Sequence, residues 1–200
     1  TLATLMFVGN QVFMKYLGDN GVGAFGIVCY YIPFVFMVGN AIAQSAQPII
    51  SYNFGLGYRS RVVATERIAL LTSVVSGGII MAAFTLFPHI LVGLFISPDN
   101  PAARIAIAGY PYFSAAFIFF ILNLTVIGYY QSVERVKPAT FLALLRGFIF
   151  LIPSFILLPQ AIGTKGIWLA LCLSEMLTTL VIVVIYSRAT RKVCLQQRTE

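Results

Sequence analysis

The chain has 200 residues, of which 60% are hydrophobic and 10% are charged, with a net charge of +7. Because soluble domains carry roughly 25% charged residues, and because the mean hydropathy here is +0.92, this composition excludes an ordinary soluble protein and indicates a bilayer protein. The positive charge would favour a nucleic-acid partner in a soluble chain, but membrane topology accounts for it below, so no nucleic-acid partner is expected.

Long apolar blocks separated by short polar connections predict an all-α integral membrane protein. A transmembrane helix needs about 20 mostly apolar residues, and these continuous runs lack the alternation typical of a membrane β-barrel. The fold class is therefore a six-transmembrane-helix bundle, with one lobe over 1–200 that ends in a basic cytoplasmic tail at 188–200. The predicted helices cover about 1–17, 22–50, 68–96, 105–130, 139–158 and 166–187.

The first predicted segment begins inside an apolar block. It has no basic region before it and no small-residue cleavage site after it, so it does not resemble a signal peptide, and the chain is expected to be part of a longer protein. Asn10, Gln11 and Lys15 are polar positions in this segment. This helix is therefore expected to face protein or water on one side.

The second segment ends in a polar stripe. Asn40, Gln44, Gln47 and Ser51 recur at helical spacing and therefore share one face. The stripe allows two interpretations, namely hydrogen bonds to a neighbouring helix, helped by the small residue Gly39 and by Ala43 beside it, or the wall of a water-accessible cavity. Beyond it, Pro48 permits a bend, and Asn53 with Gly55 permits the helix to end.

The fourth segment carries aromatic side chains on two adjacent stripes. In "SPDNPAAR", Asp99 or Asn100 can cap the helix, with a proline at its first position. Tyr110, Phe113, Phe117 and Phe120 follow helical spacing, and Tyr112, Phe119 and Asn123 lie beside them. Such a face suits flat organic cations, although aromatic stripes are more often packing.

Glu175 is predicted to lie deep in the sixth apolar segment. Acids inside a membrane are costly and are functional candidates by default. By residue count, Arg146 of the fifth segment lies within about 5 Å of the same depth, so an ion pair is possible. The alternatives are a hydrogen-bonded neutral acid, proton or cation coupling, or an accidental position near the interface.

The distribution of basic residues predicts the orientation. If the loop near Arg59 is cytoplasmic, ten basic residues lie inside and three outside, as the positive-inside rule expects. Loops near Arg59 and Arg135 and the C-terminus are then cytoplasmic. The inside group is Arg59, Arg61, Arg67, Arg135, Lys137, Arg146, Arg188, Arg191, Lys192 and Arg198, and the outside group is Lys15, Arg104 and Lys165.

Catalytic and metal-binding motifs are absent from the sequence. It contains no HExxH, no phosphate-binding glycine loop ending in Lys-Ser/Thr and no G-x-S-x-G. Cys29, Cys172 and Cys194 share no ligand-like spacing. No enzyme activity, metal site or organic cofactor is therefore expected, and a missing selectivity-filter motif weakens a channel.

Four stretches resemble the multidrug and toxic compound extrusion (MATE) transporters, bacterial multidrug branch. They are "GNAIAQSAQPIISYNFGLGYRSRV", "LFISPDNPAARIAIAGYPYF", "GYYQSVERVKPATFLALLRGFIFLIP" and "GTKGIWLALCLSE". In the first, Gln47, Pro48, Tyr52, Asn53 and Gly55 form the helix-end motif. The resemblance implies a twelve-helix transporter of two lobes, of which this chain is the second and the N-terminal lobe is the missing partner.

The resemblance further implies export of organic cations or amphiphiles across the inner cell membrane in exchange for Na⁺ or H⁺. The cavity candidates are Asn10, Gln44, Gln47, Tyr112, Phe119 and Asn123. Some family members carry coupling acids in helices that correspond to 1–17 and 105–130, yet these contain none here. Coupling is therefore expected in the missing lobe, with Glu175 a secondary candidate.

Two alternatives to efflux remain from the sequence. One is a flippase of the same superfamily for a lipid-linked precursor, which would be expected to carry several cationic side chains for a pyrophosphate. Here Arg146 is the only arginine deep in a predicted span, which favours efflux. The other is a membrane subunit that does not transport.

Overall fold

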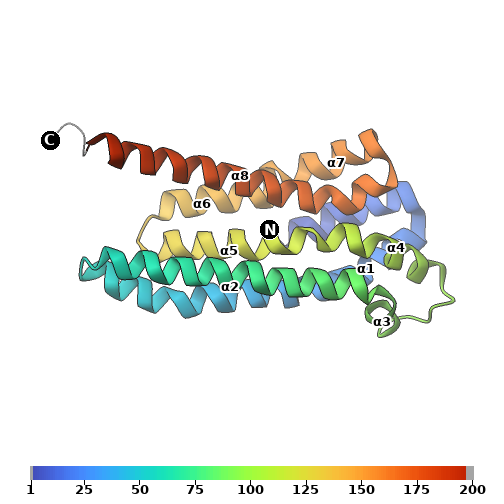
Figure 1. Cartoon of the computed structure of the whole chain (residues 1–200). Coiled ribbons are helices and arrows are strands. Elements are labelled where there is room, and N and C mark those ends of the chain that lie inside the picture. The colour runs from blue at the N-terminus through green and yellow to red at the C-terminus, as the bar shows by residue number, and fades with distance from the viewer. Residues whose placement is uncertain (1, 197–200) are drawn as a thin grey trace.

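The structure is a computed structural model that describes residues 2–196, with side chains described to residue 186. The described part contains helices and no strands, arranged as an elongated bundle (Figure 1). The elements are α1 (Leu2–Gly55), α2 (Arg59–Leu86), α3 (Pro88–Gly93), α4 (Pro101–Ser114), α5 (Ala116–Ser132), α6 (Val136–Leu144), the π-helix η1 (Leu145–Ile149), α7 (Leu151–Ile162) and α8 (Thr164–Gln196).

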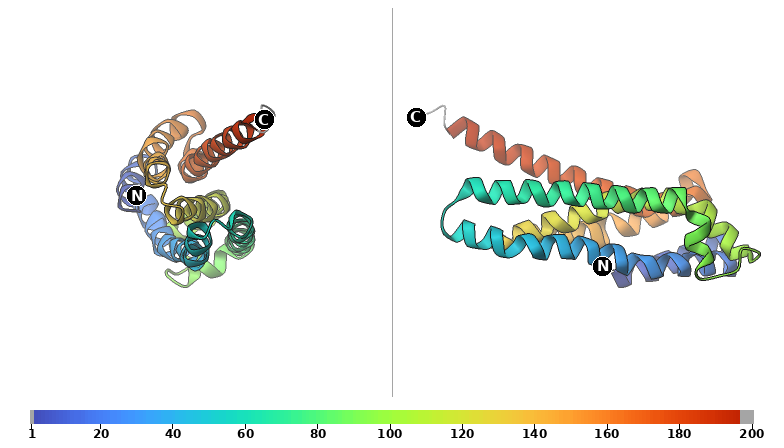
Figure 2. Two further views of the ribbon diagram at one scale, coloured as in Figure 1. Left: turned by 90° about the vertical axis from the view of Figure 1, so that its left-hand side faces the viewer. Right: turned by 60° about the horizontal axis from the view of Figure 1, so that its bottom comes forward.

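These helices form six segments along the bundle, which confirms the all-α membrane fold. Four stretches are long and apolar enough to cross a bilayer: Leu2–Gly55, Arg59–Leu86, Val136–Ile162 and Thr164–Tyr186. Together α4 and α5 form a fifth crossing, bent by 47°. The first stretch, α1, consists of two antiparallel arms that both lie along the bundle (Figure 2).

The turn inside α1 is a single residue. Gly18 has φ 62° and ψ −158°, a backbone region that is essentially limited to glycine. Gly163, between α7 and α8, repeats this conformation with φ 67° and ψ −146°. Both turns lie at the same end of the bundle (Figure 1). Each reverses the chain at one residue, where the predicted helix bounds left longer connections at 18–21 and 159–165.

Proline and capping residues move several helix boundaries away from their predicted places. The predicted segment 68–96 is instead α2, which begins at Arg59, followed by α3, because Pro88 has no N–H to continue the ladder. The next helix begins at Pro101 rather than 105. There Asn100 accepts a 2.9 Å hydrogen bond from the backbone N–H of Ala102, as an N-cap does.

The predicted helices at 105–130 and 139–158 are both interrupted. The first breaks between α4 and α5, and Pro111 inside α4 lacks a backbone donor just before the bend. The second contains η1, where the backbone N–H of Phe150 bonds to the carbonyl of Leu145 at 2.8 Å. The last helix continues past its predicted end at 187 to Gln196, and 197–200 of the predicted tail lie outside the described residues.

Helix α5 lies at the centre of the bundle and packs against α1, α2 and α8 (Figure 2). Its N-terminal half joins an aromatic core with α4, and the Thr125 hydroxyl lies 2.7 Å from that of Ser73 on α2. Tyr110, Phe113, Phe117 and Phe120 are all buried in this core. The packing interpretation of that aromatic face is therefore correct.

Candidate functional site

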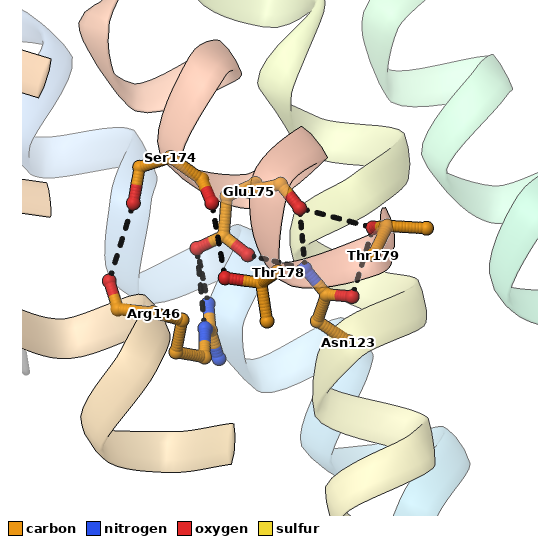
Figure 3. A network of polar contacts seen from close by, with 6 residues as sticks. All are labelled: Asn123, Arg146, Ser174, Glu175, Thr178 and Thr179. Carbon is orange, nitrogen blue, oxygen red and sulfur yellow. Dashed lines mark hydrogen bonds and ion pairs between the residues drawn. The ribbon is translucent and has the colours of Figure 1, made fainter. Parts of the chain in front are cut away.

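A buried ion pair joins α8 to η1. Glu175 and Arg146 are 1% and 6% exposed, and the arginine donates from Nε at 3.1 Å and from Nη2 at 2.8 Å to Glu175 Oε1 (Figure 3). The structure thus brings together the two charged residues that the sequence placed at similar depth. Because the extra residue of a π-helix shifts side chains around the axis, the bulge contributes to the direction of Arg146.

The second carboxylate oxygen of Glu175 is bound by Asn123 of α5. Asn123 Nδ2 donates to Glu175 Oε2 at 2.8 Å and to the backbone carbonyl of Glu175 at 3.0 Å. Thr179 donates to Asn123 Oδ1 at 2.9 Å, and Ser174 donates to the Arg146 carbonyl at 3.4 Å. We call these five residues, which come from α5, η1 and α8, the charge network (Figure 3).

Aromatic and apolar groups surround the charge network. The guanidinium carbon of Arg146 lies 4.3 Å from the centroid of the Phe120 ring, which adds a cation–π contact. Leu5, from the first arm of α1, lines a small gap beside the pair. An ion pair in such surroundings is costly to desolvate, and removal of one partner leaves an uncompensated buried charge.

An open polar cavity lies between α1 and α5. Its volume is about 500 Å³. We call it the amide cavity, because four of its lining residues carry side-chain amides and none is charged. The lining residues are Asn40, Ala43, Gln44, Gln47, Leu124, Ile127, Gly128 and Gln131.

Close contact between α1 and α5 forms the floor of the amide cavity. A Cβ on Gly128 would lie 2.7 Å from Ala43 Cβ, and one on Gly39 would lie 2.8 Å from Leu124 Cδ1. Both distances are shorter than carbon atoms tolerate. At Gly128 the neighbour is a Cβ that cannot move without its backbone, so α1 and α5 would have to separate, whereas at Gly39 the Leu124 side chain would have to shift. The small residues that the sequence singled out therefore act in helix packing, and the glutamines beside them face the open space.

The polar stripe on α1 thus serves both of the roles considered from sequence. Asn40, Gln44 and Gln47 line the cavity, whereas Ser51 donates a 3.0 Å hydrogen bond to the carbonyl of Ser132 on α5. The glutamines are exposed in this lobe and Asn40 is half-buried.

The helix-end motif ends α1 in a different way from that predicted. Pro48, Tyr52 and Gly55 are exposed, and Asn53 is buried, with Nδ2 donating to the carbonyl of Ile49 at 2.8 Å. The residue that stops the helix is Gly57, with φ 76°, because the next N–H bonds back to the Asn53 carbonyl at 2.9 Å. This is the Schellman arrangement of a helix end.

The other cavity candidates lie apart from Gln44 and Gln47. Asn123 is fully buried inside the lobe with its amide engaged, which corrects its assignment to a cavity wall. Phe119 is half-buried and packs against the aromatic core. Tyr112 lies on α4, with the Lys165 Nζ 6.0 Å from its ring centroid. Asn10 is exposed on the first arm of α1.

Sequence reasoning missed two polar residues. Gln131 lies one turn beyond Gly128 and completes the amide cavity, which the spacing from Leu124 could have indicated. Glu66 is 3% exposed and accepts a 3.1 Å hydrogen bond from Tyr186 of α8. The predicted helix bounds leave Glu66 between 22–50 and 68–96, yet its place on the buried stripe of α2 with Ser73 follows helical spacing.

Comparison with known families shows the family of this chain. A family model described as MatE matches residues 1–156. The chain belongs to the MatE family. The resemblance found in the four sequence stretches is therefore confirmed, and members of this family are transporters rather than enzymes.

Relatives with similar sequences are multidrug export proteins. MepA of Staphylococcus saprophyticus is 23% identical over 173 residues, which are 85% of this chain and 37% of that protein. MepA of Staphylococcus aureus is 22% identical over 170 residues, with the same coverage. The MatE chain described here therefore spans well under half the length of these relatives.

Solved structures share the fold of this MatE chain. An outward-facing multidrug resistance MATE transporter of the MOP superfamily superposes with a TM-score of 0.82 at 14% identity, over 90% of this chain and 41% of that one. A MOP superfamily transporter from Pyrococcus furiosus gives the same values. A MATE protein in complex with MaL6 gives a TM-score of 0.77.

Proposed function

We propose that this chain is the C-terminal lobe of a secondary active multidrug efflux transporter, which exports organic cations or amphiphiles in exchange for Na⁺ or H⁺. The observation that carries the proposal is the amide cavity between α1 and α5. It opens on the surface of the lobe, and its glutamines have no packing role in the described structure. Family membership and the names of the MepA relatives agree with this function.

The chemistry of the cavity suits amphiphilic cations. Side-chain amides offer both donors and acceptors, and their carbonyl oxygens attract a cation without the desolvation cost of a carboxylate. Leu124 and Ile127 add apolar surface. Small-molecule sites usually have mostly apolar walls with a few polar groups, whereas half of the lining residues here are amides, so hydrogen bonding is the main interaction that the cavity offers a ligand.

The same lining argues against a flippase for pyrophosphate-linked substrates. None of the described lining residues of the amide cavity is cationic. Arg146, the arginine deep in a span, is committed to Glu175 and is buried. It is therefore not available to an anionic substrate.

The charge network supports coupling outside this lobe. A coupling carboxylate must exchange its partner for an ion, but both oxygens of Glu175 are bound by protein donors. We therefore place ion coupling in the N-terminal lobe and treat Glu175 as a structural residue. The second buried acid among the described residues, Glu66, bonds to Tyr186 and is a secondary coupling candidate.

Transport would require a second lobe to close the amide cavity by alternating access. In this arrangement the end of the bundle that carries Arg59, Arg61 and Arg135 lies on the cytoplasmic side of a bacterial inner membrane. The lobe alone should not transport, because half of the cavity wall is missing. Gradient-driven dye movement with residues 1–200 alone would contradict this part of the proposal.

The test uses the complete protein in cells loaded with ethidium. We expect efflux that stops when the ion gradient is collapsed, and a reduced rate for Gln44→Leu with Gln47→Leu. The matched control is Gln160→Leu, which changes an exposed glutamine on α7 and should leave efflux unchanged. Folded protein without efflux would favour a flippase or a subunit that does not transport, and movement of a fluorescent lipid-linked substrate would identify the flippase.

A further inference from the structure

A second groove lies on the other side of α1. It has a volume of about 350 Å³ and is mostly apolar. Its walls come from α1 and α2, and the residues that line it are Ala41, Ile42, Ser45, Ala46, Ile49, Thr65, Ile68, Ala69 and Thr72. We call it the α1–α2 groove.

This groove faces away from the amide cavity. At 3.6 residues per turn, Ser45 and Ile49 project nearly opposite to Gln44 and Gln47 on α1. If the amide face looks toward water and the second lobe, the groove therefore looks toward lipid. The other wall agrees, since α2 is buried over only 22% of its most apolar window, and Ile68 is 66% exposed.

The floor of the groove is made of small, buried residues, while its rims are large and exposed. Ala46 and Ala69 are 9% and 6% exposed, whereas Ile49 on the rim is 51% exposed. The hydroxyls of Thr65 and Thr72 bond to carbonyls of their own helix. They therefore present methyl groups without unsatisfied donors, and the groove offers apolar contact along its length.

A positive charge lies at one end of the groove. The Thr65 hydroxyl donates to the backbone carbonyl of Arg61 at 2.9 Å. Arg61 therefore lies on the same face of α2 as Thr65, one turn beyond the groove and about 6 Å further along the helix axis. Arg61 is exposed and its guanidinium carbon lies 5.2 Å from the Tyr58 ring centroid. Tyr52, one turn past Ile49, is 69% exposed, as suits an aromatic residue at headgroup level.

We propose that the α1–α2 groove binds one acyl chain of an anionic phospholipid, whose phosphate lies against Arg61. The apolar floor matches a hydrocarbon chain, and the terminal arginine matches the headgroup charge. The acid next in sequence to the groove residues, Glu66, faces α8 and does not oppose the phosphate. The groove shares no lining residue with the amide cavity, but its exposure to lipid rests on the proposed position of the second lobe over the amide face.

The test measures lipid retention by the complete protein in detergent, using native mass spectrometry. The probes are phosphatidylglycerol and phosphatidylcholine of equal chain length. We expect phosphatidylglycerol to be retained about fivefold more tightly than phosphatidylcholine, because one basic residue near an anionic lipid has an effect of about this size. Arg61→Gln should remove this preference, whereas Arg104→Gln, at the other end of the lobe, should preserve it.

Filling the groove tests the acyl-chain half of the proposal. Ser45→Phe should weaken retention of both lipids severalfold, and Ala82→Phe, at an exposed α2 position outside the groove, should not. Ala41→Phe is a second groove variant if Ser45→Phe does not elute as folded protein. Equal retention of the two lipids by the unaltered protein, no effect of groove filling, or equal competition by soluble glycerophosphoglycerol would each overturn the proposal.

Discussion

The charge network and the amide cavity lie on neighbouring faces of α5, but their polar side chains differ in burial and in hydrogen bonding. In the network, Glu175 and Asn123 have their polar atoms bound by other residues of the lobe and are hidden from the surface. In the cavity, Gln44, Gln47 and Gln131 are exposed and contain no charge. The difference indicates that buried charge holds the bundle together, and under the proposed function the open amides face the substrate and the second lobe.

The largest effect is expected when the charge network loses its acid. Glu175→Gln keeps the shape of the side chain but leaves the Arg146 cation buried without a counter-charge. Such a loss costs about 3–5 kcal/mol, so thermal unfolding in detergent should shift down by roughly 10 °C or more.

Two controls separate charge from shape in this experiment. Glu134→Gln changes an exposed acid and should alter stability by less than about 0.5 kcal/mol. Arg146→Met combined with Glu175→Leu removes both charges and should recover much of the loss, because an apolar pair needs no desolvation. An unchanged melting temperature for Glu175→Gln alone would refute the structural role of the pair.

A pair of asparagines contrasts the two regions directly. Asn123→Leu removes hydrogen bonds to a charged carboxylate and should destabilise the lobe by about 1.5–3 kcal/mol. Asn40→Leu, in the amide cavity, should leave the free energy of unfolding nearly unchanged and reduce ethidium efflux by the complete protein. If Asn123→Leu instead altered efflux at unchanged stability, Asn123 would belong to the transport pathway.

Much of the fold could be predicted from sequence because it depends on local signals. Apolar run length predicted the membrane helices, and Asn100 with Pro101 marked a helix start. The single-residue turn at Gly18 and the π-helix around Arg146 were not predicted. The first depends on a backbone conformation that many glycines never adopt, and the second depends on contacts with α8 that no local window contains.

The site was harder to predict because helical spacing says which residues share a face and not what that face meets. Helical spacing grouped Asn123 with Tyr112 and Phe119. In the structure α8 covers Asn123, and Phe119 packs against the aromatic core. Tyr112 lies on α4, on the other side of the bend that precedes α5. Gln44 and Gln47 line one open cavity, and their contact with substrate stays a prediction. Their partner Gln131 comes from a helix about 85 residues away, so only the packing of α1 against α5 could reveal it.

The contact between α1 and α5 can be tested with two glycines. Alanine at a helical glycine gains about 0.5–1 kcal/mol in open space, so Gly78→Ala on α2, with nothing within 4 Å, should stabilise slightly. Gly128→Ala meets Ala43 at 2.7 Å, and overpacking of about 1–3 kcal/mol should leave a net loss of roughly 0.5–2 kcal/mol. Equal melting temperatures for the two variants would show that α1 and α5 are not in close contact.

The smallest effect tests how far the charge network extends. Thr179→Val keeps the volume of the side chain but removes the hydroxyl that donates to Asn123 Oδ1 at 2.9 Å. We expect a loss of about 0.5–1 kcal/mol, measured by chemical denaturation in detergent, and no change in efflux. Thr72→Val is the matched control, because that exposed hydroxyl bonds only within its own helix among the described contacts. In the Asn123→Leu background the Thr179→Val loss should fall to that of Thr72→Val, since the Thr179 hydroxyl then keeps only its 3.0 Å bond to the Glu175 carbonyl within α8. A larger loss there would place Thr179 outside the network.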